Sequence, residues 1–465
     1  MYAVSITPTL SAGNDALGTT AHFSRETDKQ MTEPRHPSAA EAPDTTAAAT
    51  TAGGVGAQAA TFARARRASL VGAIFMMATS AIGPGFITQT ATFTATMGAA
   101  FAFGILASIV IDFVVQLNIW RIVTVTGKRA ADLANAAIPG SGYLLAVIVI
   151  FGGLVFNVGN TAGAGLGLNA LLGLDPKIGG LISALLAISI FLVKRAGVAV
   201  DRVVVTLGIV MILLTVYVAI VSGPPVGDAL RQTVWPDQIN FATITTIVGG
   251  TVGGYITYAG AHRLLDSGTA TVDNIAQVSK AALNGILVTG AMRYILFLAI
   301  LGVVASGVVI DTSGAGANPA AQAFQAAAGE FGLRAFGLVL WAASITSVIG
   351  AAYTSISFVT VFNGRITERG RNLATVGFIL ISLVVYLLLG TAPAALLVFA
   401  GGFNGLVLPI GLTIFMYVGW FRRDLMNGYR YPVSLLVLGT LVCALTWYMG
   451  AVSVGPIFAF LGVGV

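Results

Sequence analysis

The sequence predicts an all-α polytopic membrane protein with about eleven spanning helices, and three observations carry this prediction. Hydrophobic residues form 56% of the 465-residue chain and charged residues only 9%, whereas about 25% of an ordinary soluble domain is charged. Apolar segments long enough to cross a bilayer recur from residue 68 to residue 450. Two of these segments, the first and the sixth, are interrupted by glycine or proline.

Composition also excludes several kinds of protein. The net charge is +6, but the basic residues stand in short loops between apolar segments, which indicates a topology signal and not a nucleic-acid surface. Cys443 is the only cysteine, so the sequence supports neither a disulfide framework nor a thiolate metal cluster. It contains no Walker-type phosphate loop, so ATP is not expected as the direct energy source. We expect no enzyme activity, no cofactor and no nucleic-acid partner.

The chain divides into a polar tail and a membrane domain. Residues 1–62 are rich in Ala, Thr, Ser, Pro and Gly, and predict a disordered cytoplasmic tail. Residues 63–465 form the predicted membrane domain. The stretch 309–330 reads as an external loop with room for a short alanine-rich surface helix. The predicted spans are 68–96, 99–120, 143–170, 178–194, 203–222, 241–265, 282–306, 333–361, 373–390, 394–418 and 432–450.

Loop charges orient these spans. Most basic residues fall in alternate loops, and only Lys177, Arg231 and Arg334 fall in the others. Because cytoplasmic loops carry the excess of Lys and Arg, this pattern predicts a cytoplasmic N-terminus and an external C-terminus. We expect an integral protein of the plasma (inner) membrane, in contact with membrane lipid.

The two interrupted spans are the strongest functional signal. Gly83, Pro84 and Gly85 interrupt the first span; the glycine-rich stretch 249–254 and the segment 258–261 interrupt the sixth. Lipid cannot solvate free N–H and C=O groups, so backbone leaves a helix at membrane depth only where it lines a cavity or is buried in protein. Two breaks in matching positions of two halves indicate the substrate site of a transporter.

Several polar side chains near the breaks are candidate binding residues. Gln89 follows the first break, and we expect it to face the substrate. Asn160 lines the cavity or makes an interhelical hydrogen bond. The second break is flanked by Tyr255, Thr257 and Tyr258, whose aromatic rings gate or stack on a solute or pack against the first span. We expect Asn404 in the tenth span to line the site.

Three ionisable residues are candidates for proton or ion coupling. Asp112 in the second span couples protons or pairs with a basic residue. Arg293 in the seventh span has a functional role, or it extends its charge to the interface near a cytoplasmic end. His262 acts in a proton relay, or it is solvated at the cytoplasmic end of the sixth span beside Arg263 and Asp266.

The chain resembles the NRAMP family of secondary metal transporters, which have the leucine-transporter fold. The resemblance covers about residues 70–448 and rests on the Pro84-Gly85 break, the broken sixth span that closes with Leu265-Asp266-Ser267, and the segment 404–409, Asn-Gly-Leu-Val-Leu-Pro. It implies alternating access by two inverted five-helix repeats, about 68–222 and 241–418, with an extra helix at about 432–450. It also implies coupling to a proton or a sodium ion.

This chain departs from the family at the metal ligands. NRAMP metal transporters carry Asp-Pro-Gly-Asn in the first span, where this chain has Gly83 and Phe86 in place of Asp and Asn. They carry Met-Pro-His in the sixth, where the best alignment places Ala259 at the methionine. The breaks therefore lack the carboxylate and the thioether that divalent metals prefer. We carry Gly83, Pro84, Gly85, Phe86 and Ala259 as site residues with the polar candidates above.

Two cargo classes remain open at this point. Family membership implies a divalent metal ion handled by an altered site. The residues themselves favour a small organic solute whose carboxylate binds the N-termini of the half-helices, with Gln89, Asn160 and Tyr258 holding the rest. A channel without a transport cycle is a third alternative.

Overall fold

The computed structural model describes residues 66–67, 69–74, 77–78, 80–192, 196–312, 314, 317–362, 364, 366–389 and 393–459, with no side-chain placement for 196–207. All of them lie in one compact unit, Arg66–Val465, so the predicted tail lies outside the described residues. Its helices are α2 (Pro84–Met97), η1 (Gly98–Ala100), α3 (Phe101–Thr126), α4 (Ala130–Ala137), α5 (Ser141–Leu172), α6 (Pro176–Leu192), α7 (Ala196–Val221), α8 (Val226–Val234), α9 (Phe241–Thr251), α10 (Ile256–Asp266), η2 (Val272–Asn274), α11 (Ile275–Ala305), α12 (Pro319–Ile356), η3 (Val359–Val361), α13 (Glu368–Leu388), α14 (Pro393–Phe421), η4 (Arg423–Met426) and α15 (Val433–Ala459).

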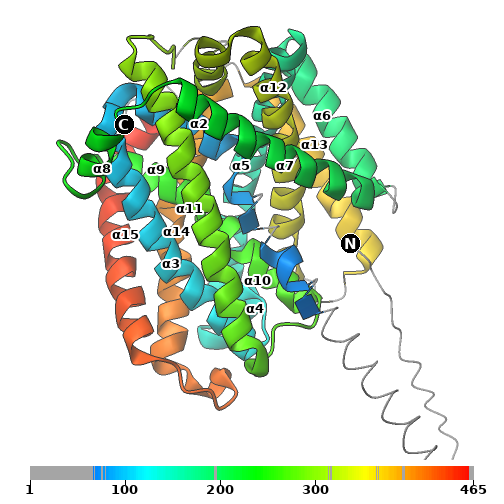
Figure 1. Ribbon diagram of the computed structural model, residues 1–465. Helices are drawn as coiled ribbons and strands as arrows, with labels where there is room; N and C mark the ends of the chain where they lie inside the picture. The colour runs from blue at the N-terminus through cyan, green and yellow to red at the C-terminus, as the bar shows by residue number, and fades with distance from the viewer. Residues whose placement is uncertain are drawn as a thin grey trace, which may run out of the picture. The chain divides into compact units, whose positions relative to one another are not determined.

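Each predicted span coincides with described helix, and the structure has long apolar helices in the expected order (Figure 1). By length and hydropathy, 7 described helices can cross a membrane, or 8 if α7 and α8 form one bent span. Three features explain why these 8 spans are fewer than the about eleven spans that the sequence predicts. The stretch Pro84–Thr126 counts as one segment, α6 has only 17 residues, and the sixth predicted span is split into α9 and α10.

Large apolar side chains cover the outside of the bundle. Val147 and Phe151 on α5, Leu185 on α6, and Ile381 and Val384 on α13 are all exposed. A soluble protein rarely exposes contiguous apolar surface of this kind, whereas lipid solvates it. The exposed faces of these helices therefore fit a lipid-facing belt, as the composition predicts.

The two predicted breaks are present, and each is shorter than the sequence suggested. The backbone leaves the helix at Ile82 and Gly83, and α2 begins at Pro84. In the sixth span only Val252–Tyr255 is non-helical. The predicted interruption at 258–261 is wrong, because these residues lie within α10. Figure 1 shows α2 and α9 toward one end of the bundle and α10 toward the other, so the sixth span is broken near its middle.

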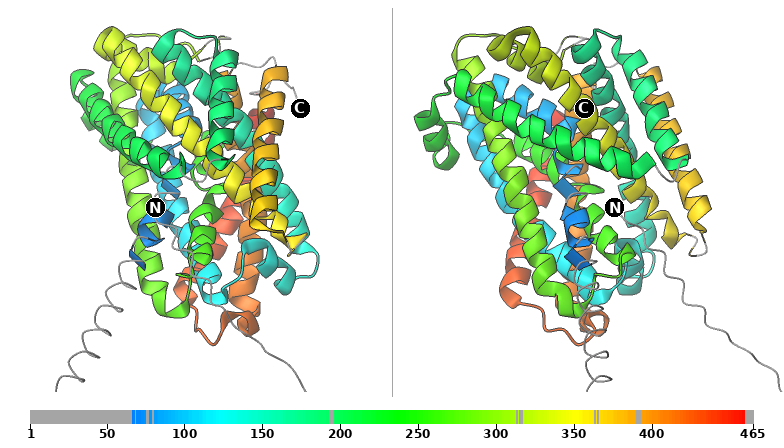
Figure 2. Two further views of the ribbon diagram at one scale, coloured as in Figure 1. Left: turned by 90° about the vertical axis from the view of Figure 1, so that its right-hand side faces the viewer. Right: turned by 45° about the vertical axis from the view of Figure 1, so that its right-hand side comes forward.

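Small residues allow the central helices to approach closely. A Cβ added at Gly167 of α5 would overlap the backbone of Trp341 in α12, and one added at Gly249 of α9 would overlap the carbonyl of Gly401 in α14. Helix contacts in membranes favour such residues because backbones then meet directly. Figure 2 shows α7 crossing outside this centre at an angle to the other helices.

The predicted cytoplasmic loops gather at one end of the unit. Arg129 pairs with Asp266, and Arg422 donates to the carbonyl of Ala136 at 2.7 Å, so the loops after α3, α10 and α14 meet. At the other end, Arg334 donates to the carbonyl of Leu171 at 2.9 Å. The loops thus segregate as the charge pattern requires, while the orientation of the two ends across the membrane stays a prediction.

The short alanine-rich helix expected within 309–330 is present, but it is the first part of α12, which is kinked at Ala328 and Gly329. One face of it is exposed and the other is buried against the bundle. Its residues Pro319, Ala323 and Phe324 are buried, and the Phe324 ring lies 4.5 Å from the Phe336 ring. The segment therefore folds back onto the outer part of the bundle.

Candidate functional site at the two helix breaks

The first break follows from the chemistry of proline. Pro84 has no N–H, so the carbonyl of Ser80 loses the partner it would have four residues on in a continuous helix. Pro84 instead starts α2, where the missing donor costs nothing. Gly83 precedes it in an extended conformation, and a Cβ there would lie 2.6 Å from the Ser347 hydroxyl of α12. Gly85 faces Phe156 of α5. The three predicted break residues are thus enclosed by α5 and α12.

The second break is shaped by Gly254 and Asn404. Gly254 has φ of +56°, a region that glycine adopts far more readily than other residues, and a Cβ there would overlap Asn404 Oδ1. The Asn404 amide donates to the carbonyls of Gly152 at 3.0 Å and Ala400 at 2.8 Å. Its Oδ1 is buried and has no hydrogen-bond partner among the described residues. Asn404 therefore joins α5 and α14 to the unwound turn.

The side-chain amide of Gln89 packs directly against two glycines, Gly250 and Gly401. Its Nε2 donates to the carbonyl of Leu397 at 3.1 Å, and its Oε1 has no partner within the described part of the chain. A Cβ at Gly250 of α9 or at Gly401 of α14 would overlap the Gln89 amide. The side chain is 0% exposed. In this conformation Gln89 bridges α2, α9 and α14, and its free oxygen is an acceptor for a hydrogen-bond donor or a cation.

A third polar cluster joins both breaks to α5. Asn160 of α5, Ser80 of the first span and Tyr255 of the second break are 0%, 2% and 0% exposed. The Tyr255 hydroxyl interacts with the side chains of Asn160 and Ser80. None of these side-chain polar atoms reaches hydrogen-bond geometry with a described partner. Buried polar groups are almost always hydrogen-bonded, so this cluster is the clearest sign of a binding position.

Ser80 carries no sequence motif that marks it as a site residue, although the proline four residues later leaves its carbonyl without a helical partner. Tyr255 directly follows the glycine-rich stretch, where the sequence leaves open whether it contacts a solute or packs against the first span. Its unsatisfied hydroxyl now distinguishes it from a packing aromatic.

Tyr258 and Ala259 lie further inward than expected. Both are buried in the first turn of α10, and the Tyr258 ring lies 5.1 Å from that of Phe358 and 6.0 Å from that of His262. The hydroxyl of Tyr258 faces Gly411 of α14. They follow the unwound turn and do not form part of it.

Asp112 and Arg293 form a buried ion pair, so the alternative that Asp112 pairs with a basic residue is confirmed. Arg293 Nη2 lies 3.5 Å from Asp112 Oδ2, and the two side chains are 1% and 2% exposed. Arg293 also donates to the Ser108 hydroxyl, and Gln116 donates to Asp112 at 3.3 Å. The expectation that Arg293 extends its charge toward the interface is wrong, because the pair lies inside the protein.

This ion pair touches both breaks. The Arg293 guanidinium lies over the Phe86 ring in the first turn of α2. Asp112 interacts with the Thr251 side chain, the last residue of α9. A pair of opposite charges thus lies directly behind Phe86 in the first turn of α2.

His262 is buried at 1% exposure, so the alternative of a solvated histidine is wrong. Its Nε2 accepts from the backbone N–H of Ala130 at 3.1 Å, which places the proton on Nδ1, 2.8 Å from the Ser357 hydroxyl. Because imidazolium has no acceptor, protonation would break the contact with α4. A coupling role for His262 stays a prediction.

Further contacts close the end of the bundle around His262, which the loop charges predict to be cytoplasmic and which we call the inner end. Asp266, at the end of α10, pairs with Arg129 and accepts from the Tyr353 hydroxyl of α12. Thr269 donates to the Ser69 hydroxyl of the first span at 2.8 Å. These contacts tie the first span, α4, α10 and α12 together, and we call them the inner network.

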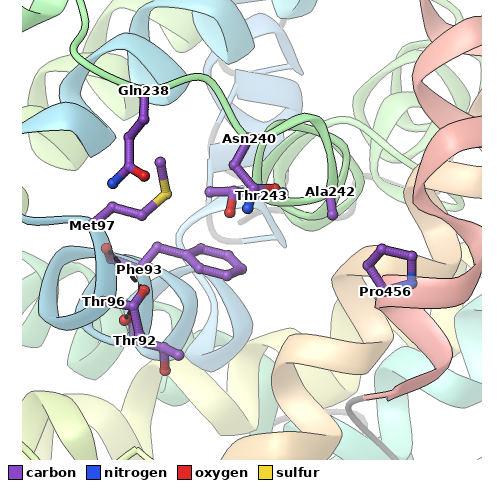
Figure 3. A pocket seen from close by; sticks show the side chains of 9 residues that line it. All are labelled: Thr92, Phe93, Thr96, Met97, Gln238, Asn240, Ala242, Thr243 and Pro456. Atoms are coloured by element: carbon purple, nitrogen blue, oxygen red, sulfur yellow. Dashed lines mark hydrogen bonds between the residues drawn. The ribbon is translucent and has the colours of Figure 1, made fainter. Parts of the chain in front are cut away.

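A cavity of about 330 Å³ lies at the outer part of the bundle (Figure 3). The lining residues come from α2, α9, α15 and the segment before α9, and Thr92 lies three residues beyond Gln89. Figure 3 shows Gln238 and Met97 on one side and Pro456 of α15 on the other. The cavity therefore stands beside the outer half-helices and not between the two breaks. It is lined by Thr92, Phe93, Thr96, Met97, Gln238, Asn240, Ala242, Thr243 and Pro456.

The groups around the breaks carry no net charge, because Asp112 and Arg293, which contact both breaks, pair with each other. Amides, hydroxyls and backbone groups surround the breaks, and the described residues contain no group of three His, Cys, Asp or Glu that could hold a metal ion. Amide and hydroxyl groups of this kind bind polar solutes through hydrogen bonds, or a monovalent cation through their oxygen atoms.

Comparison with known proteins places the chain in a family. The family model "Natural resistance-associated macrophage protein-like" matches residues 74–454. The chain is 51% identical over 381 residues to the uncharacterized membrane protein YcsG of Bacillus subtilis, covering 82% of this chain and 93% of that protein. It is 52% identical over 377 residues to an uncharacterized membrane protein of Haemophilus influenzae, covering 81% of this chain and 93% of that protein.

Solved structures share the fold at low identity. A manganese transporter of Eremococcus coleocola, crystallised with an aromatic bis-isothiourea compound, has a TM-score of 0.68 at 16% identity, covering 84% of this chain and 87% of that chain. MhsT in complex with L-phenylalanine has a TM-score of 0.60 at 16% identity, covering 84% and 98%. The predicted leucine-transporter fold is confirmed. The chain is an integral membrane protein that belongs to the Nramp family of transporters.

Proposed function

We propose that the chain is an ion-coupled symporter of a small organic solute that carries a carboxylate. The observation that carries this proposal is the neutral, hydrogen-bonding character of both helix breaks. Asn160, Tyr255 and Gln89 offer donors and acceptors that no described residue satisfies. A divalent metal ion instead favours carboxylate, imidazole or sulfur ligands, and the described residues do not group such ligands.

The half-helices supply the anion-binding element of this proposal. Both N-termini begin directly at a break. In the first turn of α2, Pro84 has no N–H and the Ile87 N–H donates to the carbonyl of Gly83, so the N–H groups of Gly85 and Phe86 remain as donors. In α10 the N–H groups of Ile256 and Tyr258 donate to carbonyls of the second break, so α2 is the main anion-binding end. A helix N-terminus carries partial positive charge and binds carboxylates. The amide oxygens of Gln89 and Asn404 are then available to N–H or O–H groups of the same solute.

Alternating access fits the asymmetry of the two ends. The inner network holds the inner end closed in this structure, with Asp266 bound by Arg129 and by Tyr353. We propose that these contacts break as cargo moves inward, in a plasma (inner) membrane protein with its N-terminus in the cytoplasm. The coupling ion is a proton or sodium, as the fold suggests.

Divalent-cation transport is the second candidate, and family membership favours it. The fold itself hosts either cargo, since the Eremococcus coleocola protein is a manganese transporter and MhsT was crystallised with L-phenylalanine. The fold therefore does not distinguish the two cargo classes, and the distinction rests on the side chains at the breaks.

A binding screen on the purified full-length protein separates the two candidates. We expect small carboxylic acids or amino acids to raise the thermal unfolding temperature and Mn²⁺ to leave it unchanged. Gln89→Ala is expected to abolish the shift by the acid. Thr233→Ala, on α8 away from the breaks, is the control and is expected to keep it. Saturable Mn²⁺ binding that disappears in Gln89→Ala would overturn the proposal in favour of the metal.

Transport is then measured by counterflow in proteoliposomes. A carrier preloaded with unlabelled acid concentrates labelled acid transiently, whereas a channel only equilibrates it. Absence of counterflow for every stabilising acid would exclude the symporter.

A further inference from the structure

We propose that Ser80, Asn160 and Tyr255 form a site for a monovalent cation, and that sodium is the coupling ion. This inference rests on the proposed symporter, because it names the ion of that same transport cycle. The three residues come from the first span, α5 and the second break. They are the point at which both interruptions of the fold meet one uninterrupted helix.

Several oxygen atoms at the three residues lack a hydrogen-bond partner among the described residues. Ser80 contributes a carbonyl that Pro84 cannot satisfy within the helix and a hydroxyl with no partner in the described structure. Asn160 Oδ1 and the Tyr255 hydroxyl are likewise without described partners. The Tyr255 hydroxyl interacts with both other side chains, so the three polar groups are neighbours. Hard cations bind oxygen ligands of this kind.

Packing holds the side chains of the cluster in place. The Tyr255 ring meets the Phe156 ring edge-on, with centroids 5.6 Å apart. Gly350 of α12 lies opposite the Ser80 hydroxyl, since a Cβ there would be 3.1 Å from it. Helix α12 therefore closes one side of the cluster without a side chain. Ligands that packing holds in place need little reorganisation when an ion binds.

The segments of the chain that supply Asn160 and Tyr255 contain no charged residue. Helix α5 has no charged residue from Ser141 to Leu172, and the second break has none from Val252 to Tyr255. The first half-helix ends at the cluster, and the C-terminal end of a helix carries partial negative charge. This field favours a cation over an anion. The desolvation cost of an ion grows with the square of its charge, so neutral ligands favour a monovalent ion over a divalent one.

The two helix ends at the first break then have separate tasks. The C-terminal end of the first half-helix receives the cation, and the N-terminal end of α2 receives the carboxylate of the cargo. Unwound carbonyls and half-helix C-termini are where broken-helix transporters hold their coupling ions. Opposite charges on adjacent sites would make each ligand bind more tightly in the presence of the other.

The test uses purified full-length protein and ²²Na⁺ as the probe, without any organic cargo. We expect saturable ²²Na⁺ binding and a higher unfolding temperature in NaCl than in choline chloride at equal ionic strength. Tyr255→Phe removes one hydroxyl and is expected to raise the Kd for Na⁺ by about tenfold or more. Ser80→Ala is expected to act in the same direction.

Tyr386→Phe is the matched control. Tyr386 of α13 also has a buried hydroxyl without a described partner, but it lies against Gly180 of α6. It should bind ²²Na⁺ as the wild type does. The unfolding temperature in choline chloride reports folding of each variant independently. If Tyr255→Phe does not fold, Ser80→Ala decides the question alone.

Two results would overturn the site. One is equal stability of the wild type in sodium and choline with no saturable ²²Na⁺ binding; the other is wild-type affinity in folded Tyr255→Phe or Ser80→Ala. Failure of the symporter is separately visible. Sodium binding with the predicted variant effects, but no counterflow of any acid, would leave the cation site standing and remove the proposed cargo. Transport of the acid that a pH gradient drives in the absence of sodium would leave the proposed cargo standing and remove sodium as the coupling ion.

Discussion

The guanidinium carbon of Arg293 lies 5.7 Å from the centre of the Phe86 ring. The contact places the only described buried ion pair of the membrane domain directly behind the first turn of α2. Arg293 is also tied to α3 through Asp112 and Ser108. The orientation of α2, and with it of the first break, therefore depends on a charge pair that belongs to α3 and α11.

Removal of one partner of this pair should destabilise the protein strongly. Arg293→Met leaves Asp112 as an uncompensated buried charge, and breaking a buried pair typically costs about 3–5 kcal/mol. We expect a large fall in the unfolding temperature, measured by thermal denaturation in detergent. The double variant Asp112→Leu with Arg293→Met removes both charges and should recover much of the loss. Arg231→Gln, which breaks an exposed pair, is the control and should change little. A double variant as unstable as the single one would contradict this account.

The conformation of Gly254 can be tested apart from its packing. Gly254→Ala meets Asn404 and a φ of +56°, and should cost roughly 3 kcal/mol or more. Gly268→Ala has a similar φ of +67° but open space around the Cβ, so only the backbone term of about 1–2 kcal/mol applies. The difference in unfolding temperature between the two variants measures the close approach of Asn404. Equal losses would show that packing at the second break is unimportant.

Release of Asp266 should open the inner end. Asp266→Asn removes the carboxylate that pairs with Arg129 and accepts from Tyr353. In a Cys443→Ser background, Ala259→Cys places a thiol at a site that is 0% exposed. We expect slow labelling of this thiol by a membrane-impermeant maleimide in inside-out vesicles, and faster labelling when Asp266→Asn is added. Asp273→Asn, an exposed neighbour, should leave the rate unchanged. Equal rates in all three proteins would argue against the inner network as a gate.

His262 provides a separate test of the inner end. His262→Ala leaves the Ala130 N–H and the Ser357 hydroxyl without their partner, which should cost about 1–3 kcal/mol. His262→Gln retains an acceptor for the N–H and should lose less. If His262 only fastens α10 to α4, the pH dependence of transport in His262→Gln matches the wild type. A shifted pH profile with unchanged stability would instead support His262 as a coupling residue.

The sequence predicts the fold well because membrane helices are governed by local rules. Apolar length locates α3, α5, α11 and α14, and basic residues such as Arg129 and Arg422 locate the loops that meet at one end. Pro84 marks the first break because it has no N–H for a helical hydrogen bond, and Gly254 marks the second because glycine readily adopts a positive φ.

The candidate site was harder to predict, since it depends on which side chains find partners. Gln89 and Asn160 are conspicuous polar residues in apolar helices, and both retain unsatisfied atoms. Tyr258 and His262 are equally conspicuous in sequence, but Tyr258 packs against neighbouring aromatic rings and His262 is hydrogen-bonded to Ala130. Ser80 gives no sequence signal beyond its spacing from Pro84. The pairing of Asp112 with Arg293 depends on the rotation of α3 against α11, which a single sequence does not contain.

The backbone contact of Gly249 with Gly401 and Gly405 has a mechanical consequence. With no side chains between them, the backbones of α9 and α14 would collide if one helix slid along the other. We therefore expect the two helices to move as one rigid unit. Any rotation of α10 relative to α9 and α14 then has to be taken up by the backbone torsions of Val252–Tyr255, the non-helical segment that joins α9 to α10.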